Sequence, residues 1–284
     1  MTRLRSANRI CSNMIKKALC SPRIYVAFLW VGFLLYGFSE KIKLFSNITG
    51  IAVSPWTFPF FTMETGSQIF IILGALLIFC DAPFLTQYSY IQLIRSGRKT
   101  WFWGTLFYIF SLSFIYVIGL FLLSVLFLLP RVELMVGWGK IIGTLAQTNA
   151  GATIGFAQLD YSIIANFKPI QAVLLTLAAV WMNCVLLGLL VYAFNLCVKK
   201  GAGIIIGAIL ALSPLLIVRL VQERLAYYLA PPVWMNLSIY NWDGYGYHPS
   251  QYYIYGILGI GIIICTLVIY LGIWKKDINT SEEF

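Results

Sequence analysis

The chain has one histidine, His248, and its ten carboxylates are scattered along the sequence. A zinc site of the H-E-x-x-H type needs two histidines on one helix face. An aspartyl pair needs two carboxylates at the same depth, because one must hold the proton that the other lacks. Asp81 is the one acid placed at the end of an apolar segment in a way that suits such depth. The sequence therefore predicts no catalytic residue and no metal site.

Nucleotide hydrolysis within this chain is excluded on the same kind of evidence. A P-loop needs G-x-x-x-x-G-K-[ST], so that backbone amides and a lysine surround the phosphates. The nearest string is Gly137-Trp-Gly139-Lys140, which lacks the spacing and the hydroxyl residue. The six cysteines follow no metal-binding spacing. The chain is thus expected to bind no cofactor, and ATP with its magnesium would belong to a partner.

The elements that hold these residues are long apolar runs. Apolar residues make up 60% of the chain and charged residues 11%, whereas a soluble domain carries about 25% charged residues. A helix needs about 20 apolar residues to cross a bilayer. The expected spans are 24–39, 62–80, 101–129, 170–196, 202–218 and 252–274. The predicted fold is an all-α polytopic membrane protein, with a basic segment 1–23 before one transmembrane domain, 24–284.

The distribution of charge orients these six spans. With the N-terminus inside, 13 of the 20 basic residues and four of the ten acids fall on the inner side. Lysine and arginine collect in cytoplasmic loops of membrane proteins, so both termini are expected inside. The basic residues lie in short clusters between apolar runs, which argues against a nucleic-acid partner.

The segment from Arg3 to Arg23 mixes basic and apolar residues and ends at Ser21-Pro22. As a helix it would place Ile15 and Leu19 on one face, which suits a helix lying on the inner membrane surface against anionic lipids. The alternative is an ordinary disordered tail up to Pro22. The apolar run that follows is no cleaved signal peptide, because Glu40-Lys-Ile-Lys43 ends it without a small-x-small site.

The inner loop 81–100 is longer than a turn requires. A short helix from about Phe84 to Arg95 would align Tyr88, Gln92 and Arg95 on one face, and such a face suits contact with a soluble partner. The alternative is a solvated loop whose cations fix orientation. Asp81 is a candidate pathway residue or the partner of an arginine such as Arg95; the alternative is a helix end exposed to water.

Aromatic residues gather on the outer side between 220 and 253. A helical stretch, 220–229, stops at Pro231-Pro232. The aromatic side chains either form an interfacial belt or, together with a re-entrant helix, form a cap over an exit path. The candidate cap residues are Tyr228, Trp234, Tyr240 and Trp242.

This layout resembles the permease subunit of bacterial type-2 ATP-binding-cassette exporters, in which the ATPase is a separate chain. The features that carry the resemblance are the basic first segment, the long loop after span two and the short fifth span before an outer excursion. The stretch Ile94-Arg-Ser-Gly-Arg-Lys-Thr-Trp-Phe-Trp-Gly104 looks like the beginning of span three in such permeases.

The resemblance implies a location in the bacterial cell membrane, a cytoplasmic ATPase partner and a second permease, identical or related. It also implies that the loop 81–100 carries the coupling helix, with Tyr88, Gln92 and Arg95 at the ATPase contact. Apolar spans favour an amphipathic or hydrophobic cargo such as a peptide, drug or lipid. The alternative function is an ATP-independent, immunity-type protein that sequesters a peptide at its outer aromatic region.

Overall fold

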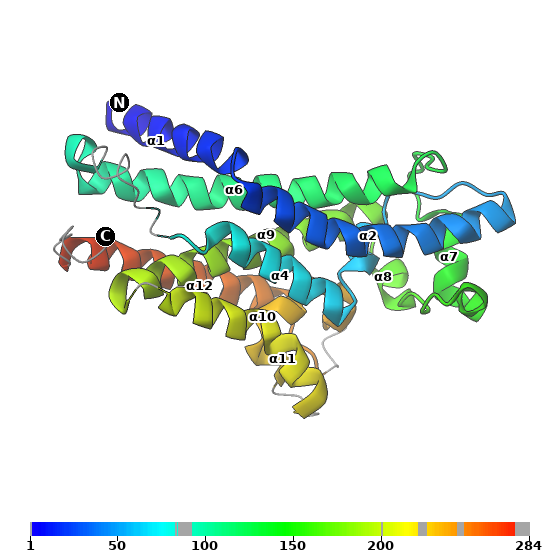
Figure 1. The fold of residues 1–284 in the computed structure, drawn as a ribbon. Helices are drawn as coiled ribbons and strands as arrows, with labels where there is room; N and C mark the ends of the chain where they lie inside the picture. Colours follow the sequence, from blue (N-terminus) through cyan, green and yellow to red (C-terminus); the bar gives the residue numbers. More distant parts are fainter. Residues whose placement is uncertain are drawn as a thin grey trace.

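The computed structural model describes residues 2–82, 84, 93–199, 201–220, 226–242 and 247–275 (Figure 1). Within these residues the chain is mostly helical, with two isolated β-bridges and no strand. The helices are α1 (Thr2–Leu19), α2 (Pro22–Thr49), α3 (Phe58–Phe61), α4 (Thr65–Phe79), α6 (Arg98–Leu128), α7 (Gly139–Gln147), η1 (Asn149–Ile154), α8 (Tyr161–Asn166), α9 (Pro169–Cys197), α10 (Ala202–Leu220), α11 (Ala226–Leu229), η2 (Pro231–Met235), η3 (Leu237–Ile239) and α12 (Gln251–Lys275).

Each of the six expected spans corresponds to a helix. In the described part of the chain, α2, α6, α9 and α12 are long and apolar enough to cross a membrane, and α4 and α10 contain shorter apolar helices. The prediction of a helical membrane protein is therefore confirmed at the level of four candidate spans.

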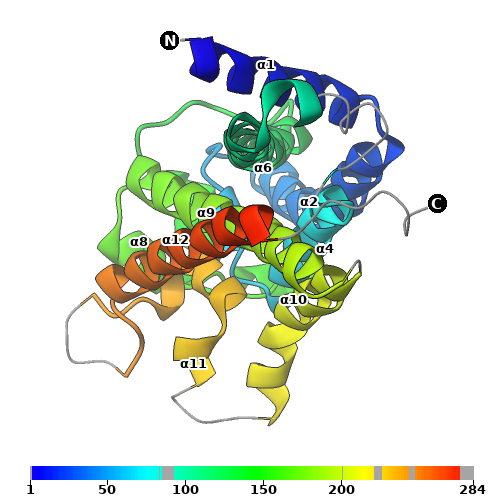
Figure 2. The ribbon, with the colours of Figure 1, turned by 90° about the vertical axis from the view of Figure 1, so that its left-hand side faces the viewer.

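Helix α9 lies at the centre of the bundle and contacts α4, α6, α10 and α12 (Figure 2). Of its most apolar 18-residue window, 61% is buried, against 22% for α12 at the edge. An apolar helix buried on all sides packs against protein, whereas one exposed on most sides requires lipid. The exposed faces of α2, α6, α10 and α12 carry the large apolar side chains that a bilayer would cover.

Helices α4 and α6 approach closely at Gly74. A Cβ atom there would collide with the hydroxyl of Tyr116, which donates a hydrogen bond to the Ile71 carbonyl (3.2 Å). The absence of a side chain at Gly74 lets the Tyr116 hydroxyl reach α4, where it is hydrogen-bonded inside an apolar core. Phe28 of α2 meets the same ring edge-on at 5.3 Å.

Helix α4 has 15 residues, and the short helix α3 comes just before it in the chain. The α3 side chains Phe58, Phe60 and Phe61 are almost completely buried. Gln68 donates to the Thr62 carbonyl (2.9 Å), which gives the irregular backbone between α3 and α4 a partner. Backbone outside regular helices is tolerated at membrane depth where protein covers it, and this segment meets that condition.

The helix that contains the first expected span is longer than the span, because α2 continues past Glu40–Lys43 to Thr49. The two lysines find acceptors in the segment after α6: Lys41 donates to the Gly155 carbonyl (2.9 Å) and Lys43 to the Leu129 carbonyl (2.6 Å). The charged residues therefore mark the position where α2 begins to pack against α7 and η1. They do not break the helix.

The first segment is a helix, and its buried face lies on α6. Ala7, Ile10 and Cys11 are at most 7% exposed, and a Cβ atom on Gly104 would lie 2.8 Å from Cγ2 of Ile10. Figures 1 and 2 together show α1 crossing the first part of α6 obliquely. Leu19, expected on the face that would lie on the membrane surface, is 41% exposed and is not part of the face that packs on α6.

Two ends of the bundle differ in chemistry. One end of the bundle contains α1, the start of α6 and the last turn of α12 (Figure 1), and we call it the basic end. The aromatic end is the opposite one, where η2, η3, α7, α8 and the start of α12 lie.

Candidate functional site

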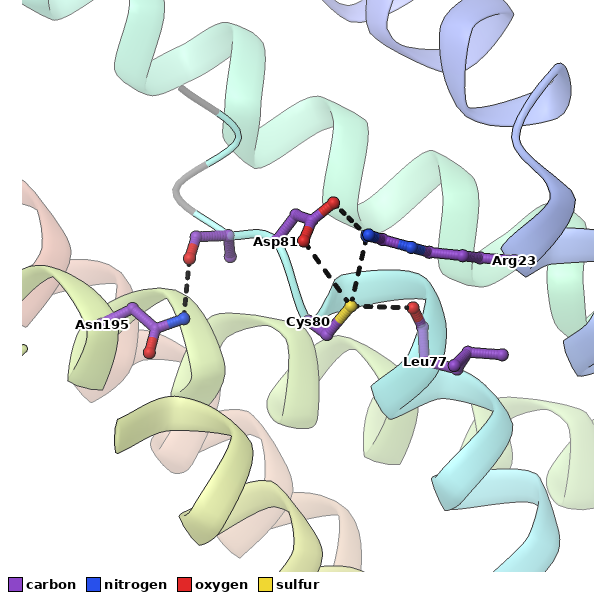
Figure 3. Close-up of polar contacts among 6 residues, drawn as sticks. Arg23, Leu77, Cys80, Asp81 and Asn195 are labelled. Atoms are coloured by element: carbon purple, nitrogen blue, oxygen red, sulfur yellow. Dashed lines mark hydrogen bonds and ion pairs between the residues drawn. The ribbon is translucent and has the colours of Figure 1, made fainter. Parts of the chain in front are cut away.

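The basic end contains an ion pair that joins the start of α2 to the residues after α4 (Figure 3). Nη1 of Arg23 donates to Oδ2 of Asp81 and to the Cys80 thiol (3.4 Å). The Cys80 thiol donates in turn to the Leu77 carbonyl (3.2 Å). The expected pairing of Asp81 with an arginine is thus correct in kind, but the partner is Arg23 and not Arg95.

Arg23 is the partner of Asp81 because the chain bends at Ser21-Pro22, between α1 and α2. We call this bend the elbow. Proline suits the first turn of a helix because its missing N–H is needed there least, so α2 starts at this position and Arg23 faces the end of α4. The two side chains are 45% and 64% exposed. An exposed ion pair contributes about 0–1 kcal/mol to the stability of the fold, so the Arg23–Asp81 contact can open at little cost in free energy.

A buried amide holds the neighbouring turn in place. Asn195 of α9 donates to the Ala82 carbonyl (2.7 Å), and its Oδ1 accepts from the backbone N–H groups of Gly201 (3.1 Å) and Gly203 (2.8 Å). One side chain, 5% exposed, therefore connects the end of α4 to the turn between α9 and α10. Sequence reasoning missed Asn195, because an asparagine near a helix end carries no signal of its distant partners.

A cleft of about 340 Å³ opens at the α1–α2 elbow. Its polar wall includes Lys17, Ser21, Arg23 and Asp81. The rest of the lining is mostly apolar and includes Phe84, whose ring meets Tyr108 edge-on at 5.0 Å. The candidate pathway residue Asp81 therefore lines a real cavity, together with a cation from each of the two helices that meet at the elbow.

The three residues expected at the partner contact are only partly placed. Tyr88 and Gln92 lie outside the described residues, as does most of the expected helix 84–95. Arg95 lies in a helical turn, 93–96, and its side chain is exposed. Leu93 of the same turn is buried against Ile10 and Trp101, so the turn that presents Arg95 is attached to both α1 and α6.

The start of α6 also contacts α12. Nη1 of Arg98 donates to the carbonyls of Ile273 (3.1 Å) and Trp274 (3.4 Å), and Nζ of Lys99 lies 5.6 Å from the centre of the Trp274 ring. A guanidinium group at a helix C-terminus satisfies carbonyls that have no partner within the helix. Arg98 and Lys99, read from sequence as orientation signals, thus also bind the last turn of α12.

At the aromatic end, the four candidate cap residues form a packed cluster. Trp234 is 1% exposed and donates to the Tyr227 carbonyl (2.7 Å), and Tyr240 donates to the Trp234 carbonyl (2.7 Å). Trp242 stacks on Tyr240 at 5.4 Å and meets Phe167 edge-on at 4.2 Å. Burial raises the pKa of the Tyr240 hydroxyl well above its usual value, so this group stays a neutral donor.

Tyr228 lies at the edge of this cluster. Its ring meets Tyr253 of α12 edge-on at 5.1 Å, and its carbonyl accepts from the Tyr253 hydroxyl (3.2 Å). The segments η2 and η3 fold back against α9 and α10. The cluster is therefore part of the core at this end. The expected helix 220–229 is described only in part, as α10 to Leu220 and α11.

His248 meets the Tyr227 ring edge-on at 5.1 Å. Among the residues the structure describes, no group of three or more histidine, cysteine or acidic side chains could hold a metal ion. The cleft at the basic end is open, whereas the cluster of Trp234, Tyr240 and Trp242 at the aromatic end is packed.

Comparison with protein-family models, curated proteins and solved structures found no significant match.

Proposed function

We propose that this chain is the permease subunit of an ATP-driven exporter of the type-2 ATP-binding-cassette kind. It would move an amphipathic or hydrophobic cargo outward with a separate ATPase chain. In this proposal α2, α4, α6, α9, α10 and α12 cross the cell membrane, and the basic end faces the cytoplasm. A second permease, identical or related, completes the transporter.

The observation that carries the proposal is the attachment of the turn 93–96 to two long helices. Leu93 is buried against Ile10 of α1 and Trp101 of α6, and Arg95 beside it is exposed. A soluble protein that binds Arg95 and moves would therefore move α1 and α6 with it. This rigid connection is what a permease needs in order to convert ATP-driven closure of a partner into helix motion.

The charge distribution supports the cytoplasmic placement of the basic end. The described side chains there include Arg5, Arg9, Lys16, Arg95 and Lys99, while Asp81 is paired with Arg23. Positive charge next to apolar helices is retained on the cytoplasmic side during insertion. The apolar helix of α4 is short, and the buried α3 segment that comes before it in the chain would supply the rest of the crossing.

The alternative, a peptide-sequestering protein, is less well supported. It needs exposed aromatic side chains with free polar groups at the aromatic end. Trp234 and Tyr240 are at most 4% exposed and donate to backbone carbonyls within the chain. A peptide could contact the exposed rings of Tyr247 (64%) and Tyr252 (89%), but it would have to displace these hydrogen bonds to reach Trp234 and Tyr240.

The experiment that tests the proposal compares two charge reversals. Arg95→Glu is expected to reduce co-purification of the ATPase at least tenfold, while membrane insertion stays normal. Arg5→Glu, which reverses an exposed charge on α1, serves as the matched control and leaves the ATPase bound. Loss of the P-loop lysine in the ATPase is expected to abolish export. Normal ATPase recovery with Arg95→Glu would disprove the assigned contact.

A further inference from the structure

Two polar side chains inside the central helix α9 have buried atoms without a hydrogen-bond partner. Among the described residues, Oγ1 of Thr176 and Oδ1 of Asn183 are unpaired, and both residues are 0% exposed. Asn183 lies midway between the two ends of α9. A buried polar atom without a partner costs free energy, and polar groups held inside a membrane bundle commonly serve a function. The two atoms therefore need an explanation that packing does not give.

Hydroxyl groups elsewhere in the bundle show which bond Thr176 could have made. Thr105 of α6 donates to the Phe102 carbonyl (2.9 Å), and Thr266 of α12 donates to the Ile262 carbonyl (2.7 Å). This bond to the preceding turn is open to any threonine in a helix. Because Thr176 does not make it, its hydroxyl keeps both its donor and its acceptor capacity for another group.

Thr176 and Asn183 share one face of α9, and that face continues to the contact with α10. Residues at spacings of three, four and seven lie on one side of a helix, so Leu187 and Val191 extend the face by one and two turns. A Cβ atom on Gly207 of α10 would lie 3.3 Å from Cδ1 of Leu187 and 3.4 Å from Cγ2 of Val191. The unpaired atoms thus belong to the side of α9 along which α10 packs.

The segment η2 closes this side of α9 toward the aromatic end. It contacts both α9 and α10, which also contact each other, so the three elements form a junction. Trp234 of η2 is 1% exposed, and Val180, between Thr176 and Asn183 on α9, is 0% exposed. The junction therefore combines apolar walls with two unpaired polar atoms, and it is closed to solvent in this conformation.

Helix α10 has a point at which it can bend beside the junction. Pro214 lies inside the helix, and a proline cannot donate to the carbonyl four residues before it. The Leu210 carbonyl accepts from the Ser213 hydroxyl instead (2.7 Å). The beginning of α10 is held by Asn195, which accepts from the Gly203 N–H (2.8 Å). The part of α10 after Pro214 can therefore move away from α9 while the part before it stays in place.

We propose that the junction of α9, α10 and η2 is a cargo subsite that opens when α10 bends at Pro214, and that its cargo is an apolar peptide. Backbone N–H groups of the peptide donate to Asn183 and Thr176, and its apolar side chains lie against Val180 and Leu187. An acyl chain has no donor and leaves both atoms unpaired. This inference rests on the proposed export function and specifies its cargo; the buried Trp234 keeps the subsite closed until the ATPase drives the change.

The accessibility of three engineered thiols tests the opening. Thr176→Cys and Asn183→Cys place a thiol in the junction. Ser113→Cys is the matched control, because Ser113 of α6 is also buried and unpaired among the described residues. It lies one turn from Ile109, which meets α9 on a different side, at Gly188.

The labelling is done in native membranes supplied with ATP, with a small membrane-impermeant methanethiosulfonate as the probe and peptide mass spectrometry as the readout. Accessible thiols react far faster than buried ones, so the two junction positions are expected to react about tenfold faster than Ser113→Cys. Pro214→Ala restores the helical donor and is expected to slow labelling of Thr176→Cys about fivefold. Equal rates at the three thiol positions would overturn the subsite.

Two synthetic peptides test the class of cargo on the purified complex of the full chain and its ATPase. The probes are a fluorescent hexapeptide of leucine and alanine and the same peptide with every backbone nitrogen methylated. A site that hydrogen-bonds a donor rejects the analogue that lacks it, so the unmodified peptide is expected to bind about tenfold more tightly. Equal affinities would refute recognition through N–H donors.

Substitutions that remove the polar atoms at similar volume complete the test. Thr176→Val and Asn183→Leu are each expected to weaken the unmodified peptide about fivefold, and Ser113→Ala less than about twofold. The thermal midpoint is expected not to fall, because an unpaired buried atom is removed. Normal peptide binding by both junction variants, with the ATPase recovered as usual, would refute the subsite and leave the exporter intact, whereas absence of the ATPase would refute both.

Discussion

The two ends of this bundle are closed in different ways. At the aromatic end, Trp234 and Tyr240 are buried, and each donates to a backbone carbonyl close by in the chain. At the basic end, the elbow is held to α4 by an exposed ion pair, Arg23–Asp81, beside an open cleft. A cluster with buried aromatic rings is costly to open, and an exposed ion pair is not. Motion is therefore expected to begin at the basic end.

The largest expected effect comes from the aromatic end. Trp234→Ala removes a side chain that is 1% exposed, together with its hydrogen bond to Tyr227. Loss of a buried tryptophan costs about 3–5 kcal/mol, so the thermal midpoint of the purified protein is expected to fall strongly. Trp103→Ala is the control, because Trp103 is 49% exposed, and its midpoint should change little. Similar losses for both would remove the distinction between a closed end and a lipid-facing surface.

The second effect concerns the buried anchor at the basic end. Asn195→Ala leaves the Ala82 carbonyl and the N–H groups of Gly201 and Gly203 without their partner. The expected loss of stability is about 1–3 kcal/mol, measured by thermal unfolding and by protease cleavage between α9 and α10.

A second asparagine on the same helix provides the control. Asn183 donates to the carbonyl of Ala179 within α9, and its Oδ1 has no partner among the described residues. Asn183→Ala is expected to be close to neutral, since it also removes an unsatisfied acceptor. Equal destabilisation by the two substitutions would show that Asn195 is no special anchor.

The third effect is on the rate at which the thiols of Cys11 and Cys20 react with a maleimide. Cys11 is buried between α1 and α6, and burial raises the pKa of its thiol, whereas Cys20 is exposed. A raised pKa leaves less thiolate at pH 7–8, so Cys11 is expected to react with a soluble maleimide at least tenfold more slowly than Cys20. The rate at Cys11 should rise as the pH increases toward that raised pKa. Mass spectrometry of the labelled peptides gives both rates.

Crowding at Gly104 should remove this protection. Gly104→Val places atoms against Ile10 and separates α1 from α6, so Cys11 is expected to approach the rate of Cys20. Gly37→Val, at a position with open space around it, is the matched control and should leave Cys11 protected. Continued protection in Gly104→Val would mean that α1 is held by something other than this crossing.

The smallest effect is expected at the ion pair. Asp81→Asn should change stability by less than about 1 kcal/mol, because both partners are largely exposed. The thermal midpoint provides the measurement, and the doubly reversed variant Arg23→Asp with Asp81→Arg should match the natural chain. A loss as large as that of Trp234→Ala would mean that the basic end is closed as firmly as the aromatic end.

The long apolar runs of the sequence predicted the helices well. Each run is continuous in the sequence, and it packs against lipid or the apolar core without needing one particular distant residue. The expected span 170–196 differs from α9 (Pro169–Cys197) by one residue at each end. The continuation of α2 beyond Glu40–Lys43 could not be predicted, because the acceptors of the two lysines, the carbonyls of Leu129 and Gly155, are far along the chain.

The candidate site could be predicted only in part for the same reason. Asp81 was singled out from its place at a helix end, but its partner Arg23 lies 58 residues away. The aromatic residues near 240 were recognised as a cluster, but their burial depends on packing of η2 and η3 against α9 and α10. Long-range contacts of this kind leave no periodic signal in a single sequence.

The central claim is that this chain works with a separate ATPase at its basic end. The most direct measurement is purification of the tagged chain from its native membrane after crosslinking in cells, with quantitative mass spectrometry of what accompanies it. The account predicts a soluble ATPase with a P-loop, in equal amount to the permease and crosslinked near Arg95. Recovery of the chain alone, with no such ATPase even after crosslinking, would contradict it.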